Sequence, residues 1–417
     1  MPTVEESDAA SGTDTAELEA RLARYPARRY PAQYAAAAFH LGTAQLQRRR
    51  VSEALSNLRA AHDVFGRLGM RLEQAKALTM HGVALREAGR SDLARQSFER
   101  AVTVFVELGQ PVEEAAASYD LGLTLQDEGD GPSARQALSR ARGLFLAAGY
   151  LAQAGAAARE EGASLLASGR FEAARALLQE ATSLAERGGD LPGLGAAANA
   201  LGLAQLASDD APAAALTFSS AVGAYPRSLR PAEHAMAKAN LALAHERAGS
   251  PARSRLAARQ ALAVHGVDPT VRAQAQEILD RLIEEAQLDL LVVLDAEPLE
   301  QWPSIIRDEA LRWCDAATSE RLVAVRGFLD GLLARPGTSY DLAESLLAVV
   351  LELPPQQYGT LVTAIVQGTG QLDATDGERV RAVVGSALAR FAIPQWQRLA
   401  SSLNTAAAAA GEPAGWR

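Results

Sequence analysis

Apolar residues recur along this chain with helical spacing, and short polar or glycine-containing breaks separate the segments that carry them. Between residues 75 and 88, leucine, valine and alanine fall on one face of a helix. Gly89 follows, and glycine readily takes the left-handed conformation that ends a helix. Ser91 then stands where an N-cap is expected, ahead of a second amphipathic segment over residues 92–108. The pattern predicts a pair of helices joined by a tight turn.

This hairpin pattern recurs every forty residues. The first helix of each unit carries a small residue at one fixed place: Gly42, Gly82, Gly122, Gly162, Gly202 and Ala242. Nineteen residues later the second helix carries alanine: Ala61, Ala101, Ala141, Ala181, Ala221 and Ala261. Small residues let two crossing helices approach closely, which a larger side chain would prevent. Each hairpin can bury its apolar face only by stacking on the next, so the spacing predicts an array.

These residues resemble the tetratricopeptide repeat, which places small residues at its eighth, twentieth and twenty-seventh positions and a bulky apolar residue at its twenty-fourth. Counted from Ala75, those positions hold Gly82, Ala94, Ala101 and Phe98. The resemblance covers about residues 34–269, with a period longer than the usual one of about 34 residues. It departs from the pattern at Arg49 and Asp209, which stand where other repeats have the turn glycine. The end repeats are therefore expected to act as caps.

The forty-residue period ends near residue 289, and all four tryptophans lie beyond that point. Proline and glycine there separate further segments with helical periodicity: 303–315, 319–334, 339–353, 356–367, 377–391 and 394–405. A short apolar run, 290–294, fits a strand or a buried helix, and the lack of a second strand nearby favours the helix. We expect an all-α protein: a right-handed superhelical array of about six hairpins, followed by a C-terminal helical bundle.

The expected domain boundaries follow these changes of pattern. They give a disordered N-terminus (1–14), an N-terminal helix with a Tyr-Pro segment leading into the array (15–34), six repeats (35–274), a capping helix (275–288), an all-helical C-terminal domain (289–405) and a disordered tail (406–417).

Charge and composition narrow the classes of partner. The 417 residues include 41 Lys and Arg against 50 Asp and Glu, a net charge of −9. Nucleic-acid binding usually needs a concentrated basic surface, so we expect no nucleic-acid partner. The first fourteen residues hold four acids and no base, unlike a secretory signal, and we expect a cytoplasmic protein. The long uncharged stretches are too weakly apolar to cross a bilayer, so we expect no membrane partner.

The sequence offers no clear catalytic or metal-binding group. Cys314 lies on a predicted helix among apolar residues, and all six histidines lie at or before His265, so no Cys–His pair is indicated. The histidines show no pair at the spacing that a helix needs to bind a metal ion. Neighbouring acids such as Glu160 and Glu161 point in different directions on a helix. We expect no catalytic residue, no cofactor and no metal ion.

The resemblance implies that the first helices line a concave groove, with known slots facing inward. The candidate groove residues are Phe39, Thr79, Arg86, Tyr119, Gln126, Arg159 and Asn199. Such a mixture suits a protein or peptide partner, with Tyr119 as an apolar anchor and Arg86 or Arg159 pairing with a carboxylate. Packing between helices explains any single position equally well.

Three functions stay open. The first is a non-enzymatic scaffold or adaptor that binds a partner segment in the groove and could dimerise through its C-terminal domain. The second is a regulatory module that senses a peptide or small molecule and acts through a protein partner. The third is an all-helical enzyme of unrecognised type, with a pocket where array and bundle meet, near Trp302, Arg312 and Trp313.

Overall fold

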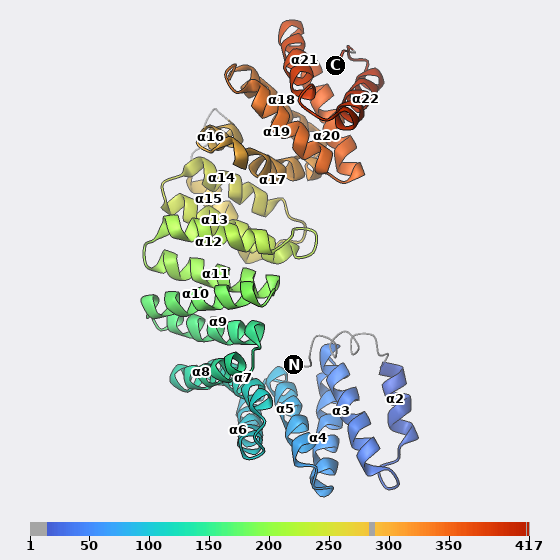
Figure 1. The fold of residues 1–417 in the computed structure, drawn as a ribbon, viewed down its shortest axis with the longest axis vertical. Coiled ribbons are helices and arrows are strands. Elements are labelled where there is room, and N and C mark those ends of the chain that lie inside the picture. Colours follow the sequence, from blue (N-terminus) through green and yellow to red (C-terminus); the bar gives the residue numbers. More distant parts are fainter. Residues whose placement is uncertain (1–14, 283–287, 414, 417) are drawn as a thin grey trace. The chain divides into compact units, whose positions relative to one another are not determined.

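The computed structural model describes residues 15–282, 288–413 and 415–416, and within these ranges it contains helices and turns but no strand (Figure 1). The expected all-α fold is confirmed. The helices form two compact units, one ending at Asp210 and the other beginning at Ala211. The expected disordered N-terminus, 1–14, and residues 283–287 of the expected capping helix lie outside the described residues.

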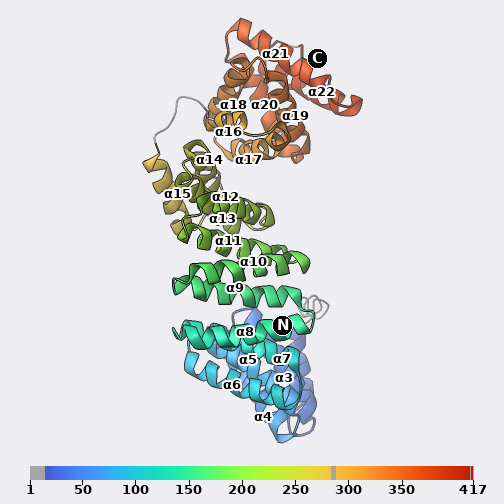
Figure 2. The ribbon, with the colours of Figure 1, turned by 60° about the vertical axis from the view of Figure 1, so that its left-hand side comes forward.

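The first unit consists of helices joined by short turns. Its helices are α2 (Thr15–Arg24), α3 (Pro31–Gln47), α4 (Val51–Arg67), α5 (Arg71–Glu87), α6 (Ser91–Glu107), α7 (Pro111–Asp127), α8 (Gly131–Ala147), α9 (Leu151–Ala167), α10 (Phe171–Arg187) and α11 (Leu191–Ala207). From α3 to α11 each helix has 17 residues, and each is joined to the next by three residues. Two views show α9, α10 and α11 stacked in chain order (Figure 1, Figure 2).

The regular spacing of glycine in the first helices has a direct steric cause within the hairpins. A Cβ atom added to Gly122 would lie 2.6 Å from Cγ of Leu138 on the second helix, and one added to Gly82 would lie 2.8 Å from the Phe98 ring. Gly42 and Gly162 meet Leu58 and Leu178 in the same way. The bulky apolar residue of the second helix thus covers the glycine of the first, a contact that the spacing alone did not identify.

The turns are defined by backbone hydrogen bonds. Gly89 has φ +71°, and its N–H donates to the Arg86 carbonyl at 2.9 Å. Arg49 and Asp209, which replace the turn glycine, take the same left-handed conformation with φ +57°. The expected N-cap at Ser91 is wrong: α6 begins at Ser91 itself, and no side chain caps it. Backbone hydrogen bonds already stabilise the three-residue turn between α5 and α6, so the turn does not need a hydrogen bond from a serine hydroxyl.

The second unit continues with helices of less regular length. They are α12 (Ala211–Ala224), α13 (Pro231–Arg247), α14 (Pro251–Leu262), α15 (Pro269–Arg281), α16 (Asp289–Asp295), the short 3₁₀ helix η1 (Leu299–Gln301), α17 (Trp302–Asp315), α18 (Thr318–Leu333), α19 (Ser339–Glu352), α20 (Pro355–Gly370), α21 (Ala374–Leu388) and α22 (Ile393–Ala410). The helix expected over residues 290–294 is confirmed as α16.

One apolar core joins the C-terminal helices to the preceding repeat helix. It contains Trp302, Trp313 and Trp416 together with Ala252 and Leu256 of α14. The boundary between the compact units therefore falls after Asp210, and residue 289 lies inside the second unit. The expected disordered tail is also folded over its described part, because α22 continues to residue 410 and Trp416 is 1% exposed. The buried indole of Trp416 anchors this segment to the apolar core. The small and polar residues around it in the sequence gave no sign of such an anchor.

Candidate partner-binding face

The first helices of the repeats in the first unit, α3, α5, α7, α9 and α11, form a continuous wall. Each of α3, α5, α7 and α9 contacts the first helix of the next repeat as well as the helices on either side of it in the chain, and α11 contacts α9 and α10. Because a first helix packs against other helices on several sides, much of its own surface must carry small or apolar residues. In α9, for example, three alanines and two glycines are buried. The second helices instead keep a single buried stripe and an exposed polar side, as in α10.

One side of this wall keeps partly exposed side chains, which we call the first-helix face. It consists of Phe39 and His40 on α3, Met80 and Val83 on α5, Tyr119, Asp120 and Leu123 on α7, Arg159, Glu160 and Ala163 on α9, and Asn199, Ala200 and Leu203 on α11. These positions recur at intervals of forty residues, so they hold equivalent places on successive helices.

Two of the sequence-predicted residues, Tyr119 and Arg159, are brought together across adjacent repeats. Arg159 lies close enough to Tyr119 for its positive charge to act on the ionisation of the phenol, and it also pairs with Glu160. Burial raises the pKa of Tyr119 to about 12, and the negative charge of Glu160 adds to the rise. The phenol is therefore neutral at physiological pH, and the pair offers a half-buried aromatic ring beside a guanidinium.

Arg86 and Gln126 connect the first helices to one another. The Arg86 Nε atom lies 3.0 Å from Oδ2 of Asp127, which ties α5 to α7. Gln126 donates from Nε2 to the backbone carbonyl of Glu160 at 3.1 Å, which ties α7 to α9. The Arg86 guanidinium and the Gln126 amide, which were expected to contact a partner, thus already form hydrogen bonds within the first unit.

The other three predicted residues have different surroundings. Thr79 is only 9% exposed, and its hydroxyl donates to the Ala75 carbonyl at 3.1 Å, so it acts as a packing residue. Phe39 is half-buried and packs edge-to-face on His40, with ring centroids 5.5 Å apart. Asn199 is half-buried on α11. The central residues Tyr119 and Arg159 therefore remain the strongest candidates.

Sequence reasoning missed an acid at the centre of this face. Asp120 follows Tyr119 on α7, and burial raises the pKa of its carboxyl to about 6. No hydrogen bond or ion pair joins the Asp120 side chain to another described residue. The available signal was its register: Glu160 stands forty residues later, at the same place on the next first helix.

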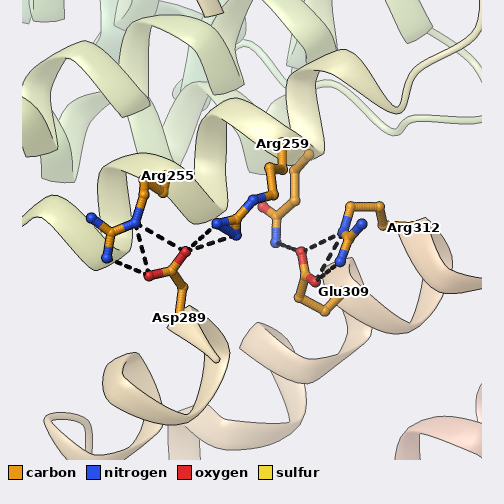
Figure 3. A network of polar contacts seen from close by, with 6 residues as sticks. Arg255, Arg259, Asp289, Glu309 and Arg312 are labelled. Carbon is orange, nitrogen blue, oxygen red and sulfur yellow. Dashed lines mark hydrogen bonds and ion pairs between the residues drawn. The ribbon is translucent and has the colours of Figure 1, made fainter. Parts of the chain in front are cut away.

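The place where an enzymatic pocket was considered, near Trp302 and Trp313, is filled. Both indoles are buried, and a polar network joins α14 to α16 and α17 beside them (Figure 3). Arg255 and Arg259 both bind the carboxylate of Asp289, with Arg255 Nη2 lying 2.6 Å from Oδ1. Glu309 accepts hydrogen bonds from Arg312 and from Gln260 of α14. These charged groups satisfy one another and hold the two parts of the unit together.

A pocket of about 420 Å³ lies elsewhere in the second unit, between α18 and α20. Its lining is mainly small and hydroxyl-bearing: Thr318, Arg321, Leu322, Gly359, Thr360, Thr363, Ala364 and Gln367. Arg321 is occupied, because it donates to the backbone carbonyls of Trp313 and Ala316 at 2.8 and 2.7 Å. The lining thus includes no aspartate, glutamate, histidine or cysteine that could act as an acid, base or nucleophile.

The remaining reactive side chains do not form a catalytic group. Burial raises the pKa of the Cys314 thiol to about 11, so the nucleophilic thiolate is scarce at neutral pH. Among the described residues, no three His, Cys, Asp or Glu side chains gather as metal ligands. None of the described helices combines the length and the apolar character needed to cross a bilayer.

Comparison with known proteins identifies the repeats. The family model of the tetratricopeptide repeat matches residues 79–145, 119–192 and 159–229. No curated protein matches the chain. Among solved structures, the chain is similar to BtubC (BKLC) from P. vanneervenii, with 13% identity and a TM-score of 0.46 over 57% of this chain and 95% of that one.

Two other solved structures are similar at a comparable level. A putative kinesin light chain from Podosopora anserina with nearly identical TPR-like repeats is 16% identical, with a TM-score of 0.37 over 52% of this chain and 98% of that one. A Rap protein complexed with competence and sporulation factor is 13% identical, with a TM-score of 0.45 over 85% of this chain and 83% of that one.

Proposed function

Residues 79–229 belong to the tetratricopeptide-repeat family, and from this premise we propose that the protein is a non-enzymatic scaffold that binds a segment of a protein partner along the first-helix face. The observation that carries the proposal is the proximity of Tyr119 and Arg159, which hold equivalent positions on the adjacent first helices α7 and α9. It places an aromatic ring and a guanidinium from adjacent repeats side by side at the centre of the wall.

The energetics of recognition favour this pair as the centre of the contact. Tyrosine and arginine are enriched among the residues that contribute most to protein–protein binding. The ion pair between Arg159 and Glu160 restricts the arginine side chain before a partner arrives, which reduces the entropy lost on binding. Ala116, Ala156 and Ala163 on the same two helices are small and partly exposed, and they leave room for a partner's side chains.

The test is a double substitution, Tyr119→Ala with Arg159→Ala. A partner is first identified by affinity capture and mass spectrometry, and its binding to the purified full-length chain is then measured by calorimetry. We expect the double variant to bind at least roughly tenfold more weakly, because loss of one such residue typically costs about 2 kcal/mol or more. Circular dichroism should show that the helix content is unchanged.

The matched control is Leu93→Ala with Arg100→Ala, an apolar residue and an arginine that are both exposed on the second helix α6. It should bind like the wild type. Unchanged binding by the Tyr119 and Arg159 variant would contradict the proposal. Loss of binding on replacing the exposed Ile393 and Trp396 of α22 would then move the site to the second unit.

A further inference from the structure

The pocket between α18 and α20 has a volume of about 420 Å³, which is within the usual range for sites that bind small ligands. The two helices pack side by side, although α19 lies between them in the chain. The beginning of α18 supplies Thr318, Arg321 and Leu322. The residues of the opposite wall are spaced so that they share one side of α20: Gly359, Thr360, Thr363, Ala364 and Gln367.

Arg321 is the one charged residue among the described residues that line this pocket, and its side chain is held in place by the end of α17. The Nε atom donates to the Trp313 carbonyl at 2.8 Å, and the Nη2 atom donates to the Ala316 carbonyl at 2.7 Å. These acceptors carry no net charge, and Arg321 forms no ion pair with a described acid. Nη1 takes part in neither bond, so an anion can bind there without the entropy cost of ordering the guanidinium.

The other polar groups of the pocket are uncharged. Thr360 donates its hydroxyl to a backbone carbonyl of its own helix at 2.9 Å, so its oxygen remains available as an acceptor. The Thr363 hydroxyl and the Gln367 amide form no hydrogen bond with another described residue. Hydroxyl and amide groups both donate and accept, so they suit the hydroxyl groups of a ligand. Leu322 and Ala364 add a smaller apolar part.

The charge of the lining narrows the class of ligand. A phosphate monoester carries close to two negative charges at neutral pH, whereas the lining supplies a single cation. The described lining also holds no acid that could pair with the ammonium group of an amino acid. A carboxylate has one negative charge and forms a strong charge-assisted hydrogen bond with a guanidinium. A monocarboxylate therefore matches this pocket better than a phosphate or a zwitterion.

We propose that the pocket binds a small organic monocarboxylate that also carries hydroxyl groups. The carboxylate binds Arg321, and the hydroxyl groups bind Thr363 and Gln367 on the opposite wall. This inference is independent of the first-helix face and goes beyond the proposed function, because it gives the second unit a ligand of its own. The lining offers no general base or nucleophile, so the ligand is bound and not converted.

The experiment measures binding of hydroxy acids to the full-length chain by calorimetry and by saturation-transfer NMR. The probes are lactate, mandelate and gluconate, each beside its amide, which keeps the hydroxyl groups but lacks the charge. We expect at least one acid to bind, and to bind at least roughly tenfold more tightly than its amide. Arg321→Gln should weaken binding of that acid at least roughly tenfold, and Thr363→Val should weaken it by a smaller factor.

Gly359→Leu tests the location of the site. A Cβ added to Gly359 meets nothing within 4 Å, so a leucine fits the fold and occupies the pocket that this glycine lines. This variant should abolish binding. The matched control is Gly327→Leu on α18, where an added Cβ is equally unobstructed but the residue lies outside the lining. Arg326→Gln, at an exposed arginine of α18, is the control for charge. Both controls should bind like the wild type.

Three results would overturn the inference: no acid of the panel binds, the amides bind as tightly as the acids, or binding survives Gly359→Leu. Arg321→Gln also removes hydrogen bonds to the end of α17, so thermal melting must show that this variant is folded. If it is not folded, the comparison of acids with amides and the pair Gly359→Leu and Gly327→Leu decide the question. None of these results bears on partner binding by Tyr119 and Arg159.

Discussion

At the scale of single residues, Asp120 gives the sharpest energetic prediction. Its pKa is about 6 in the folded protein because of burial, against a usual value of 3.8. Above pH 6 the folded state holds an ionised carboxylate that the unfolded chain solvates better, so Asp120 lowers the free energy of unfolding there. Below about pH 3 both states bind the proton and this cost disappears.

The variant Asp120→Asn should therefore raise the free energy of unfolding by about 2 kcal/mol at pH 7.5 and leave it almost unchanged at about pH 3. Denaturant titrations of the wild type and the variant at the two pH values measure the difference. The exposed control Asp92→Asn should change little at either pH. Destabilisation by Asp120→Asn at both pH values would mean that the carboxylate already has a hydrogen-bond donor in the folded protein.

The sequence predicts part of the candidate site at this scale. Tyr119 and Arg159 stand forty residues apart, so the repeat alone places them on adjacent helices, and the structure brings them close together. The pairing of Arg86 with Asp127 could not be predicted, because an acid at a helix end resembles any solvated acid in sequence. Burial of Asp120 likewise depends on which neighbours cover it, which a single sequence does not specify.

At the scale of helices, the close approach of the two helices in each hairpin leads to a second prediction, which concerns stability. A Cβ at position 122 would lie 2.6 Å from Cγ of Leu138 and 3.3 Å from the backbone oxygen of Ala134. Gly122→Ala should therefore force α7 and α8 apart and lower the free energy of unfolding by about 1–3 kcal/mol, although alanine is the better helix former. Chemical denaturation followed by circular dichroism measures the change.

Two further variants make the steric cause testable. Gly143→Ala lies on α8 with nothing within 4 Å of its added Cβ, and it should stabilise by about 1 kcal/mol or less. Leu138→Ala removes the side chain that the new methyl group meets, so Gly122→Ala should cost less in the Leu138→Ala background than in the wild type. Equal costs in both backgrounds would show that the crossing is not limited by this contact.

The positions of many helices could be predicted, because proline, glycine and the spacing of apolar residues indicate within each segment where a helix begins and ends. The segments predicted at 339–353 and 303–315 match α19 and α17 to within a residue at each end. The miss at Ser91 has a local cause as well, since a three-residue turn closed by backbone hydrogen bonds shifts the helix start by one position. The folded segment after Ala410 was missed because its anchor, Trp416, is separated from the helix by small and polar residues.

At the scale of the whole molecule, the repeat register predicts the array, but it does not predict where one compact unit ends. The period fails near residue 289, which suggested a domain boundary there. The structure instead joins α14 to the C-terminal helices through a shared apolar core and through Arg255 and Asp289, which are 2% and 3% exposed. Such pairing depends on residues from different parts of the chain that share no sequence pattern.

The buried ion pair between Arg255 and Asp289 leads to the last prediction, which concerns the stability of the second unit. Breaking a buried ion pair by removing one partner costs about 3–5 kcal/mol. Asp289→Ala removes the carboxylate that Arg255 and Arg259 both bind, and the Arg255 guanidinium is almost completely buried. The exposed pair of Arg307 and Glu352 is the matched control, and Glu352→Ala should cost about 1 kcal/mol or less. The double variant Arg255→Met, Asp289→Leu should recover part of the loss, since it removes both buried charges.

The tryptophans allow the two units to be followed separately. All four lie between residues 302 and 416, so tryptophan fluorescence reports only on the second unit, whereas far-ultraviolet circular dichroism reports on the helices of both. Asp289→Ala should shift the fluorescence transition to lower denaturant concentration and leave the circular dichroism change of the first unit at its wild-type position. If both signals shift together, the units unfold as one, and the Asp289 network then stabilises the whole array and not only its C-terminal part.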